Sequence, residues 1–304
     1  MKSLISTLAL ILLTLPLYAV STSEHNNGLE TIHNIEIGTV GDTVLHAEIL
    51  RPYPMPPGLL PAVLWIHGGA WLYGTQKEFS WSHGLAERGY VVVSVEYRFA
   101  NKAKWPAQLE DCRMALRWLR ANASAYQVDS NHIGAWGHSA GAQLASVLGL
   151  YGDGHPYKGE SKAFAGVSNS IQAVVDEAGP TDLVGTATQF NGTDVGTVSG
   201  LIGAGYTQDK AAWEDADALL HISAKAPPFL VVHGELDEKV PIQESESFVA
   251  ALSAAGVPVT FITVKNGNHH METTDKSHPT SPTQQQLLDI ITAFFDKNLK
   301  ATRS

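Results

Sequence analysis

Short, uninterrupted apolar runs alternate with amphipathic helical segments along most of this 304-residue chain. Such runs are typical of strands buried on both faces of a parallel sheet, and the intervening helices return the chain to start the next strand. The clearest strands cover 62–66 and 90–97, and the clearest helix covers 106–121, with a proline in its first turn. The alternation predicts one α/β domain over 20–304, with a mostly parallel sheet of about eight strands and helices on both faces.

The other expected elements complete this alternation. Two strands with period-two patterning come first and form a hairpin around Gly41-Asp42. These two edge strands are expected at 32–37 and 44–50, and the remaining strands at 133–136, 171–178, 229–232 and 259–264. The remaining helices are expected at 80–88, 140–150, 242–255 and 283–299.

One region, 183–225, interrupts the pattern. It holds six glycines and five threonines, with a short helical stretch around 211–220. We expect a small cap insertion over the strand ends, where ligands bind in sheets of this kind. The alternative is a long surface connection without a role.

Residues 1–19 form a separate segment. Lys2 is the only charge before Glu24, residues 8–17 are nearly all apolar, and Ala19 offers a small residue at the exit. This layout predicts a secretory signal peptide, a secreted or periplasmic protein, and no stable membrane insertion after cleavage. A retained anchor is the alternative, but Pro16 breaks a run that is short of the roughly 20 apolar residues that span a bilayer.

Charge and cysteine content exclude several functions. The 30 acidic and 20 basic side chains give a net charge of −10, which argues against a nucleic-acid partner. The single cysteine, Cys112, excludes a disulfide framework, a multi-cysteine metal site and a cysteine hydrolase. It shares a helical apolar stripe with Leu109 and Leu116, so we expect it in the core.

The pentapeptide Gly137–Gly141 (Gly-His-Ser-Ala-Gly) lies between a predicted strand and a predicted helix. A sharp strand-to-helix turn exposes a nucleophilic serine, and the flanking glycines avoid clashes within that turn. Ser139 is therefore the candidate nucleophile, and His138 beside it is expected to contact substrate. The alternative is an ordinary Gly/Ser turn.

The segment His67–Trp71 (His-Gly-Gly-Ala-Trp) follows the strand at 62–66. Acyl transfer develops an oxyanion, which needs preorganised N–H donors. We predict that the N–H groups of Gly69, Ala70 and Ala140 form this oxyanion hole and that Trp71 walls the acyl pocket. A common Gly-Gly turn is the alternative.

A carboxylate must orient the base of such a site, and Asp237 follows the strand at 229–232. We predict that Asp237 is this acid. Asp182, after another strand, is the outside candidate, and Glu235 and Glu238 are neighbours that could be confused with Asp237.

Histidine supplies a general base near neutral pH, and two histidines follow the strand at 259–264. We predict that His269 is the base and keep His270 as the alternative. No carboxylate–histidine spacing nearby supports a zinc site, so we expect neither a metal nor a cofactor.

The chain order Ser139, Asp237, His269 resembles that of the α/β-hydrolases. The segment 60–153, with the two glycine motifs above, is similar to the esterase/lipase branch that includes BD-FAE-type feruloyl esterases and carbohydrate acetylesterases. One departure is His270, where the family usually has glycine. The resemblance implies an α/β-hydrolase fold and a serine carboxylesterase that acts through an acyl-enzyme. The predicted secretion adds that the esters are external ones, of acetyl or feruloyl type. The substrate would be a small-molecule or polysaccharide-linked ester.

Two other functions stay open. An arylformamidase-like amide hydrolase shares the same motifs, although its usual intracellular role fits poorly with a signal peptide. A catalytically inactive hydrolase-fold binding module is the second, and the intact serine, acid and base argue against it. The aromatic residues Trp71, Tyr73, Trp81 and Trp213 are candidates for lining the pocket, or for packing only.

Overall fold

The computed structural model describes residues 21–79, 82–154, 162–189 and 196–300. The predicted signal peptide at 1–19 and Trp81 lie outside the described residues. Within them, one sheet has nine strands in the order β1-β2-β3-β5-β4-β6-β7-β8-β9. All pairs from β5 to β9 are parallel, which confirms the mostly parallel sheet.

Eight of the nine described strands overlap their predicted positions, and the first was not expected. The strands are β1 (Thr22–Asn26), β2 (Leu29–Val40), β3 (Thr43–Pro52), β4 (Leu60–Ile66), β5 (Val91–Val95), β6 (Val128–His138), β7 (Val174–Glu177), β8 (Phe229–Gly234) and β9 (Val259–Val264).

Four of the described helices follow the prediction, the helix expected at 80–88 is shorter, and two helices in the insertion were not expected. The helices are α1 (His83–Ala86), α2 (Ala107–Ala121), α3 (Ala140–Tyr151), α4 (Leu183–Gln189), α5 (Thr197–Ile202), α6 (Lys210–Ala216), α7 (Ile242–Ala254) and α8 (Gln284–Leu299), with 3-10 turns η2 (Ala123–Tyr126) and η3 (Ala218–His221).

The antiparallel end of the sheet contains the predicted hairpin and one strand more than expected. Val40 pairs with Thr43, so β2 and β3 turn at Gly41-Asp42 as predicted. The additional strand, β1, pairs with β2, and all five of its residues are exposed. An exposed strand has no apolar face, so the sequence carries no period-two signal for it.

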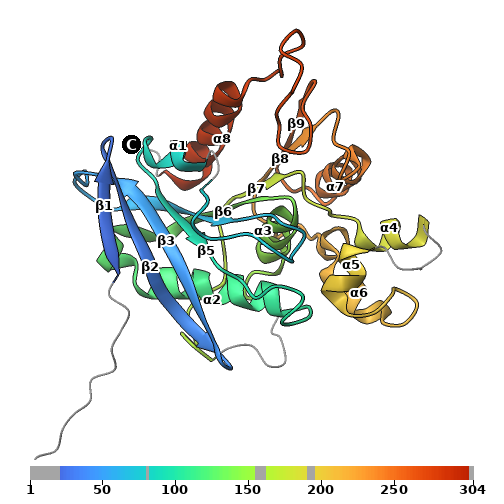
Figure 1. Ribbon diagram of the computed structural model, residues 1–304, viewed down its shortest axis with the longest axis horizontal. Helices are drawn as coiled ribbons and strands as arrows, with labels where there is room; N and C mark the ends of the chain where they lie inside the picture. The colour runs from blue at the N-terminus through green and yellow to red at the C-terminus, as the bar shows by residue number, and fades with distance from the viewer. Residues whose placement is uncertain (1–20, 80–81, 155–161, 190–195, 301–304) are drawn as a thin grey trace, which may run out of the picture.

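Helices cover both faces of the sheet because alternate strand residues point to opposite faces. In β4, Leu64 and Ile66 belong to the buried cluster that also contains residues of the helices α2, α3 and α7, whereas Trp65 belongs to the cluster that contains residues of α1 and α8. Figure 1 shows α1 and α8 on one side of the strands and α2 on the other. Each such fully buried side chain stabilises the fold by about 1.5–3 kcal/mol. The two-faced architecture is therefore confirmed.

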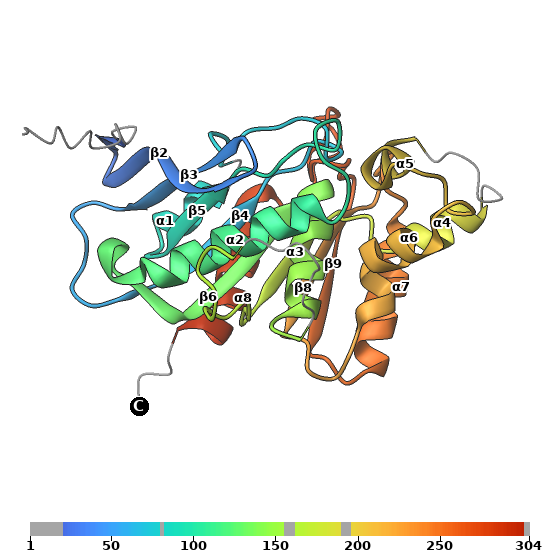
Figure 2. The ribbon, with the colours of Figure 1, turned by 90° about the horizontal axis from the view of Figure 1, so that it is seen from below.

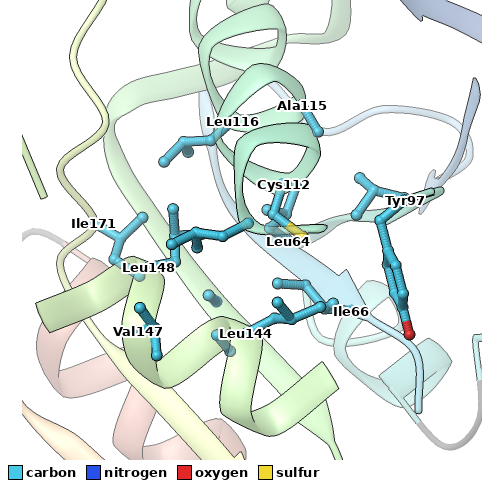
Figure 3. Packing of buried hydrophobic residues seen from close by; sticks show 14 of the residues in the cluster. Leu64, Ile66, Tyr97, Cys112, Ala115, Leu116, Leu144, Val147, Leu148 and Ile171 are labelled. Carbon is cyan, nitrogen blue, oxygen red and sulfur yellow. The ribbon is translucent and has the colours of Figure 1, made fainter. Parts of the chain in front are cut away.

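The larger core lies between the sheet and the helices α2 and α3. Figure 3 shows Cys112 of α2 above Leu64 and Ile66 of β4, with Leu144 and Leu148 of α3 beside them. Cys112 is fully buried, which confirms its predicted place in the core.

The insertion at 183–225 gathers α4, α5 and α6 at one end of the molecule (Figure 2). The helix expected at 211–220 is in fact two elements, because Asp217 caps η3 by accepting the N–H of Leu219. Trp213 is fully buried and donates its indole N–H to the Ala204 carbonyl at 2.9 Å. It packs inside the insertion and does not line the pocket. Among the described helices, none is long and apolar enough to cross a membrane.

Candidate active site

Ser139 lies in a tight turn between β6 and α3. Its backbone has φ 56° and ψ −122°, and its N–H donates to the Glu177 carbonyl at 2.8 Å. A Cβ on Gly137 would lie 2.1 Å from the Gly141 carbonyl oxygen, and a Cβ on Gly141 would lie 2.0 Å from the Ile66 carbonyl oxygen. Both distances are too short for any side chain, so the two glycines allow the turn that exposes Ser139.

Three predicted residues form one hydrogen-bonded chain. His269 Nε2 lies 2.9 Å from Ser139 Oγ, and His269 Nδ1 lies 2.7 Å from Asp237 Oδ2. The Asp237 side chain is 1% exposed and that of His269 is 11% exposed. This geometry can take a proton from a serine hydroxyl and stabilise the imidazolium that results.

Asp237 keeps its negative charge despite its burial. Burial acts to raise the pKa of Asp237, but hydrogen bonds from His233 and His269 and from the N–H groups of Lys239 and Val240 outweigh it. The net result is a pKa well below the usual range for a carboxyl group.

The alternative residues have other partners. Asp182 accepts the N–H of Gly185 at 2.8 Å, and Glu235 accepts the N–H of Asn266 at 3.0 Å. The His270 ring stacks on His138 with centroids 4.9 Å apart and an interplanar angle of 29°. The hydrogen-bonded chain to Ser139 therefore runs through Asp237 and His269.

The loop after β4 has an unusual backbone. Gly69, Ala70 and Trp71 have φ angles of 109°, 52° and 59°, and the Gly69 carbonyl accepts the N–H groups of Leu72 and Tyr73. A Cβ on Gly69 would lie 1.9 Å from the Tyr73 carbonyl oxygen. The loop is therefore held in a strained turn that a residue with a side chain at position 69 would disrupt.

This loop, the serine turn and the insertion enclose one cavity of about 680 Å³. Gly69, Ala70 and Ala140, the predicted oxyanion donors, line it together with Ser139. The complete lining is Trp65, His67, Gly68, Gly69, Ala70, Trp71, Tyr73, Gly74, Glu78, His138, Ser139, Ala140, Pro180, Leu183, Thr186, Thr197, Val198, Lys239, Val240, Pro241, Glu244, His269 and His270.

Trp71 and His138, the predicted substrate contacts, both line the cavity. Trp71 is 2% exposed and donates its indole N–H to Gln143 Oε1 at 3.1 Å, so it forms a fixed wall. His138 also has a second contact, because its Nε2–H donates to the His269 carbonyl at 2.9 Å. Burial lowers the pKa of His138 to about 4, so its ring is neutral near pH 7.

Two residues of this region had no predicted role. His233 Nε2 lies 3.1 Å from Asp237 Oδ2, the same oxygen that His269 contacts. Glu244 of α7 lines the cavity and accepts the N–H groups of Thr181 and Asp182, where the insertion begins. His233 belongs to the same motif as Asp237, which was a signal. Glu244 lies on an ordinary helix and carried none. Among the described residues, no group of three or more His, Cys, Asp or Glu side chains is arranged to hold a metal ion.

The fold is shared with solved esterase structures. A truncated carbohydrate esterase from gut microbiota superposes with a TM-score of 0.75 and 24% identity, over 88% of this chain and 95% of that one. A bifunctional GH43-CE protein of Bacteroides eggerthii gives a TM-score of 0.72 and 29% identity, over 83% of this chain and 36% of that one. These similarities confirm the predicted α/β-hydrolase fold.

Sequence comparison identifies the family. Esterase LipC of Mycobacterium tuberculosis is 30% identical over 79% of this chain, and the chain spans 60% of the length of LipC. The BD-FAE family model matches residues 52–252, more than half of the chain and including the serine turn, the loop after β4 and Asp237. The chain therefore belongs to the BD-FAE family of α/β-hydrolases.

Proposed function

We propose that this protein is a serine carboxylesterase in which Ser139, His269 and Asp237 form the catalytic triad. The observation that carries the proposal is the hydrogen-bonded chain from Ser139 Oγ through His269 to Asp237, with its serine end in the cavity. The esterase names of the relatives and the match to the BD-FAE model support the same reaction class.

In the proposed mechanism, Ser139 Oγ attacks the ester carbonyl carbon while His269 Nε2 takes its proton. The N–H groups of Gly69, Ala70 and Ala140 stabilise the tetrahedral oxyanion. The C–O bond to the alcohol then breaks, and His269 gives its proton to the departing oxygen. Water repeats the same steps on the acyl-enzyme, which releases the carboxylic acid and restores Ser139.

The cavity favours a short or flat acyl group. Trp71 is locked in place by its bond to Gln143, and the loop carrying it cannot widen without disturbing the turn at Gly69. The polar side chains of Lys239 and Glu244 on another wall suit an alcohol with hydroxyl groups. We therefore propose acetyl- or feruloyl-type esters, carried on small molecules or polysaccharides, as substrates.

We further propose that the protein is exported, on the basis of the sequence of residues 1–19. The substrates inferred above, when attached to polysaccharides, are found outside the cell. Expression of the full chain followed by N-terminal sequencing of the protein in the medium or periplasm tests this proposal, and an uncleaved protein in the cytoplasm would contradict it.

The Ser139→Ala variant tests the proposed reaction. We expect it to lose hydrolysis of p-nitrophenyl acetate while its thermal unfolding stays unchanged, because only the nucleophilic oxygen is removed. Thr292→Val is a matched control, since it also removes one buried hydroxyl, which lies in α8 and donates to the Leu288 carbonyl outside the cavity. Full activity in Ser139→Ala would refute the proposal.

A substrate panel separates the alternatives. Acetyl, butyryl and feruloyl esters should be hydrolysed faster than an aryl formamide. A preference for the formamide would indicate an arylformamidase-like enzyme. Saturable ester binding without turnover in the wild type would indicate a binding module.

A further inference from the structure

A second histidine contacts the Asp237 carboxylate from inside the protein. His233, near the end of β8, is fully buried. Its Nε2 lies 3.1 Å from Asp237 Oδ2 and 2.9 Å from the Val240 carbonyl oxygen, and its Nδ1 lies 2.7 Å from Ser245 Oγ on α7.

These partners determine which nitrogen of His233 carries the proton. A carbonyl oxygen only accepts hydrogen bonds, so Nε2 must be protonated to pair with Val240. Asp237 Oδ2 lies 3.1 Å from this same protonated nitrogen. In the neutral ring, Nδ1 accepts the hydroxyl hydrogen of Ser245, which fixes the ring from its other side.

The Asp237 carboxylate is then saturated with donors. Oδ2 accepts the N–H of His269 and lies 3.1 Å from the protonated Nε2 of His233, and Oδ1 accepts the backbone N–H groups of Lys239 at 2.7 Å and Val240 at 3.1 Å. Four donors on two oxygens leave the carboxylate no freedom to rotate. Because both imidazoles donate to the same oxygen, the charge available to His269 depends on His233.

We propose that His233 is a positioning residue for the esterase reaction, holding Asp237 in line with His269 and moderating the negative charge that His269 experiences. The inference rests on the proposed catalytic role of Asp237. The other ionisable groups that act on this pair are buried Asp176 of β7, whose charge interacts with His233, and His138, whose charge interacts with Asp237.

Packing alone does not explain an imidazole at this position. Burying a polar ring costs free energy that only its hydrogen bonds offset. Phenylalanine would fill similar space without that cost. His233 instead uses both ring nitrogens, and one of them is directed at the group that orients the predicted base.

The test compares His233→Phe, which removes the donor, with His233→Gln, which keeps an N–H donor near the Nε2 position. In His233→Phe we expect kcat for p-nitrophenyl acetate to fall about tenfold with KM nearly unchanged. We also expect the acid limb of the kcat/KM profile to move to higher pH, because the less neutralised carboxylate holds the proton on His269 more tightly. His233→Gln should restore most of both effects.

Tyr90→Phe is the matched control. Tyr90 is also a buried ring, at the amino end of β5, and its hydroxyl donates to the Asp296 carboxylate. The substitution therefore removes one hydrogen-bond donor, as His233→Phe does. It should change neither kcat nor the pH profile. Circular dichroism and thermal unfolding verify that each variant is folded.

The outcomes separate this inference from the proposed function. A wild type without esterase activity would refute the proposed function itself. An active wild type whose His233→Phe variant has an unmoved acid limb, or a lower kcat that glutamine does not restore, would overturn the role of His233. If His233→Phe fails to fold, the far-downfield NMR resonance of the His269–Asp237 proton decides. It should shift in His233→Leu, which also removes the donor, and stay near its wild-type position in His233→Gln and in Tyr90→Phe. An unshifted resonance in His233→Leu, or an equally large shift in His233→Gln, would overturn the inference.

Discussion

Gly141 is a point where the serine turn and the loop after β4 touch each other. It lies in the first turn of α3, and a Cβ at this position would be 2.0 Å from the Ile66 carbonyl oxygen and 2.5 Å from that of His67. Both carbonyls belong to the chain that leads from β4 into the loop with Gly69 and Ala70. The Gly141→Ala variant therefore tests whether this close backbone contact sets the geometry of the site.

The size of the effect follows from these distances. Cβ atoms do not approach other heavy atoms closer than 3.0 Å, so α3 and the end of β4 must separate by about 1 Å to admit the methyl group. Such overpacking costs about 1–3 kcal/mol of unfolding free energy, partly offset by about 1 kcal/mol because alanine favours the helix. A 1 Å misplacement of reacting groups costs roughly 10²-fold in rate. We therefore expect activity to suffer more than stability.

Steady-state hydrolysis of p-nitrophenyl acetate and urea unfolding measure the two effects separately. In Gly141→Ala, kcat should fall about 100-fold while the unfolding free energy falls by no more than about 2 kcal/mol. Gly200→Ala is the matched control, because Gly200 is also helical and a Cβ there would meet nothing within 4 Å. A Gly141→Ala enzyme with kcat within twofold of the wild type would refute the reasoning.

Two further predictions concern buried ionisable groups. Burial raises the pKa of Asp217 to about 7, so its carboxyl favours folding below pH 4 and this contribution is lost as the pH rises to 7. Asp217→Asn should remove up to about 4 kcal/mol of that pH dependence in urea unfolding, and parallel stability curves for both proteins would contradict it. Burial lowers the pKa of His138 to about 4. The contribution of His138 to the unfolding free energy is therefore present above pH 6.5 and is lost as the pH falls to 4. His138→Phe should reduce this loss of unfolding free energy at acid pH by roughly 3 kcal/mol. It should also lower kcat about tenfold, because the bond to the His269 carbonyl is lost. An unchanged kcat would show that this bond is dispensable.

The parts of the site that the sequence predicts are those in which local chemistry dictates residue type. The sequence predicts the places of Gly137 and Gly141 because a strand-to-helix turn leaves no room for side chains there. The residues that support the site cannot be predicted from the sequence in this way. The contact between His233 and Asp237 depends on the path of a single loop, and the contact of Glu244 with Thr181 joins segments 63 residues apart.

Aromatic residues show the same limit. Trp71 and Trp213 were both candidates for the pocket, and both are large enough to serve there. Trp71 lines the cavity, whereas Trp213 is fully buried within the insertion. Composition cannot distinguish them, because the difference arises only when α6 packs against its neighbours.

The adjacent histidines show how a loop resolves an ambiguity that sequence leaves open. Asn268 Oδ1 accepts the N–H groups of His270 and Glu272, and the Asn268 carbonyl accepts the N–H of Met271. This tight turn directs the two neighbouring rings differently: His269 reaches Ser139, whereas His270 stacks on His138. Because His138 precedes Ser139 and also donates to the His269 carbonyl, one side chain joins the serine turn to the loop of the predicted base. The position of His269 relative to Ser139 is thus fixed by contacts between two loops 131 residues apart, which no local motif encodes.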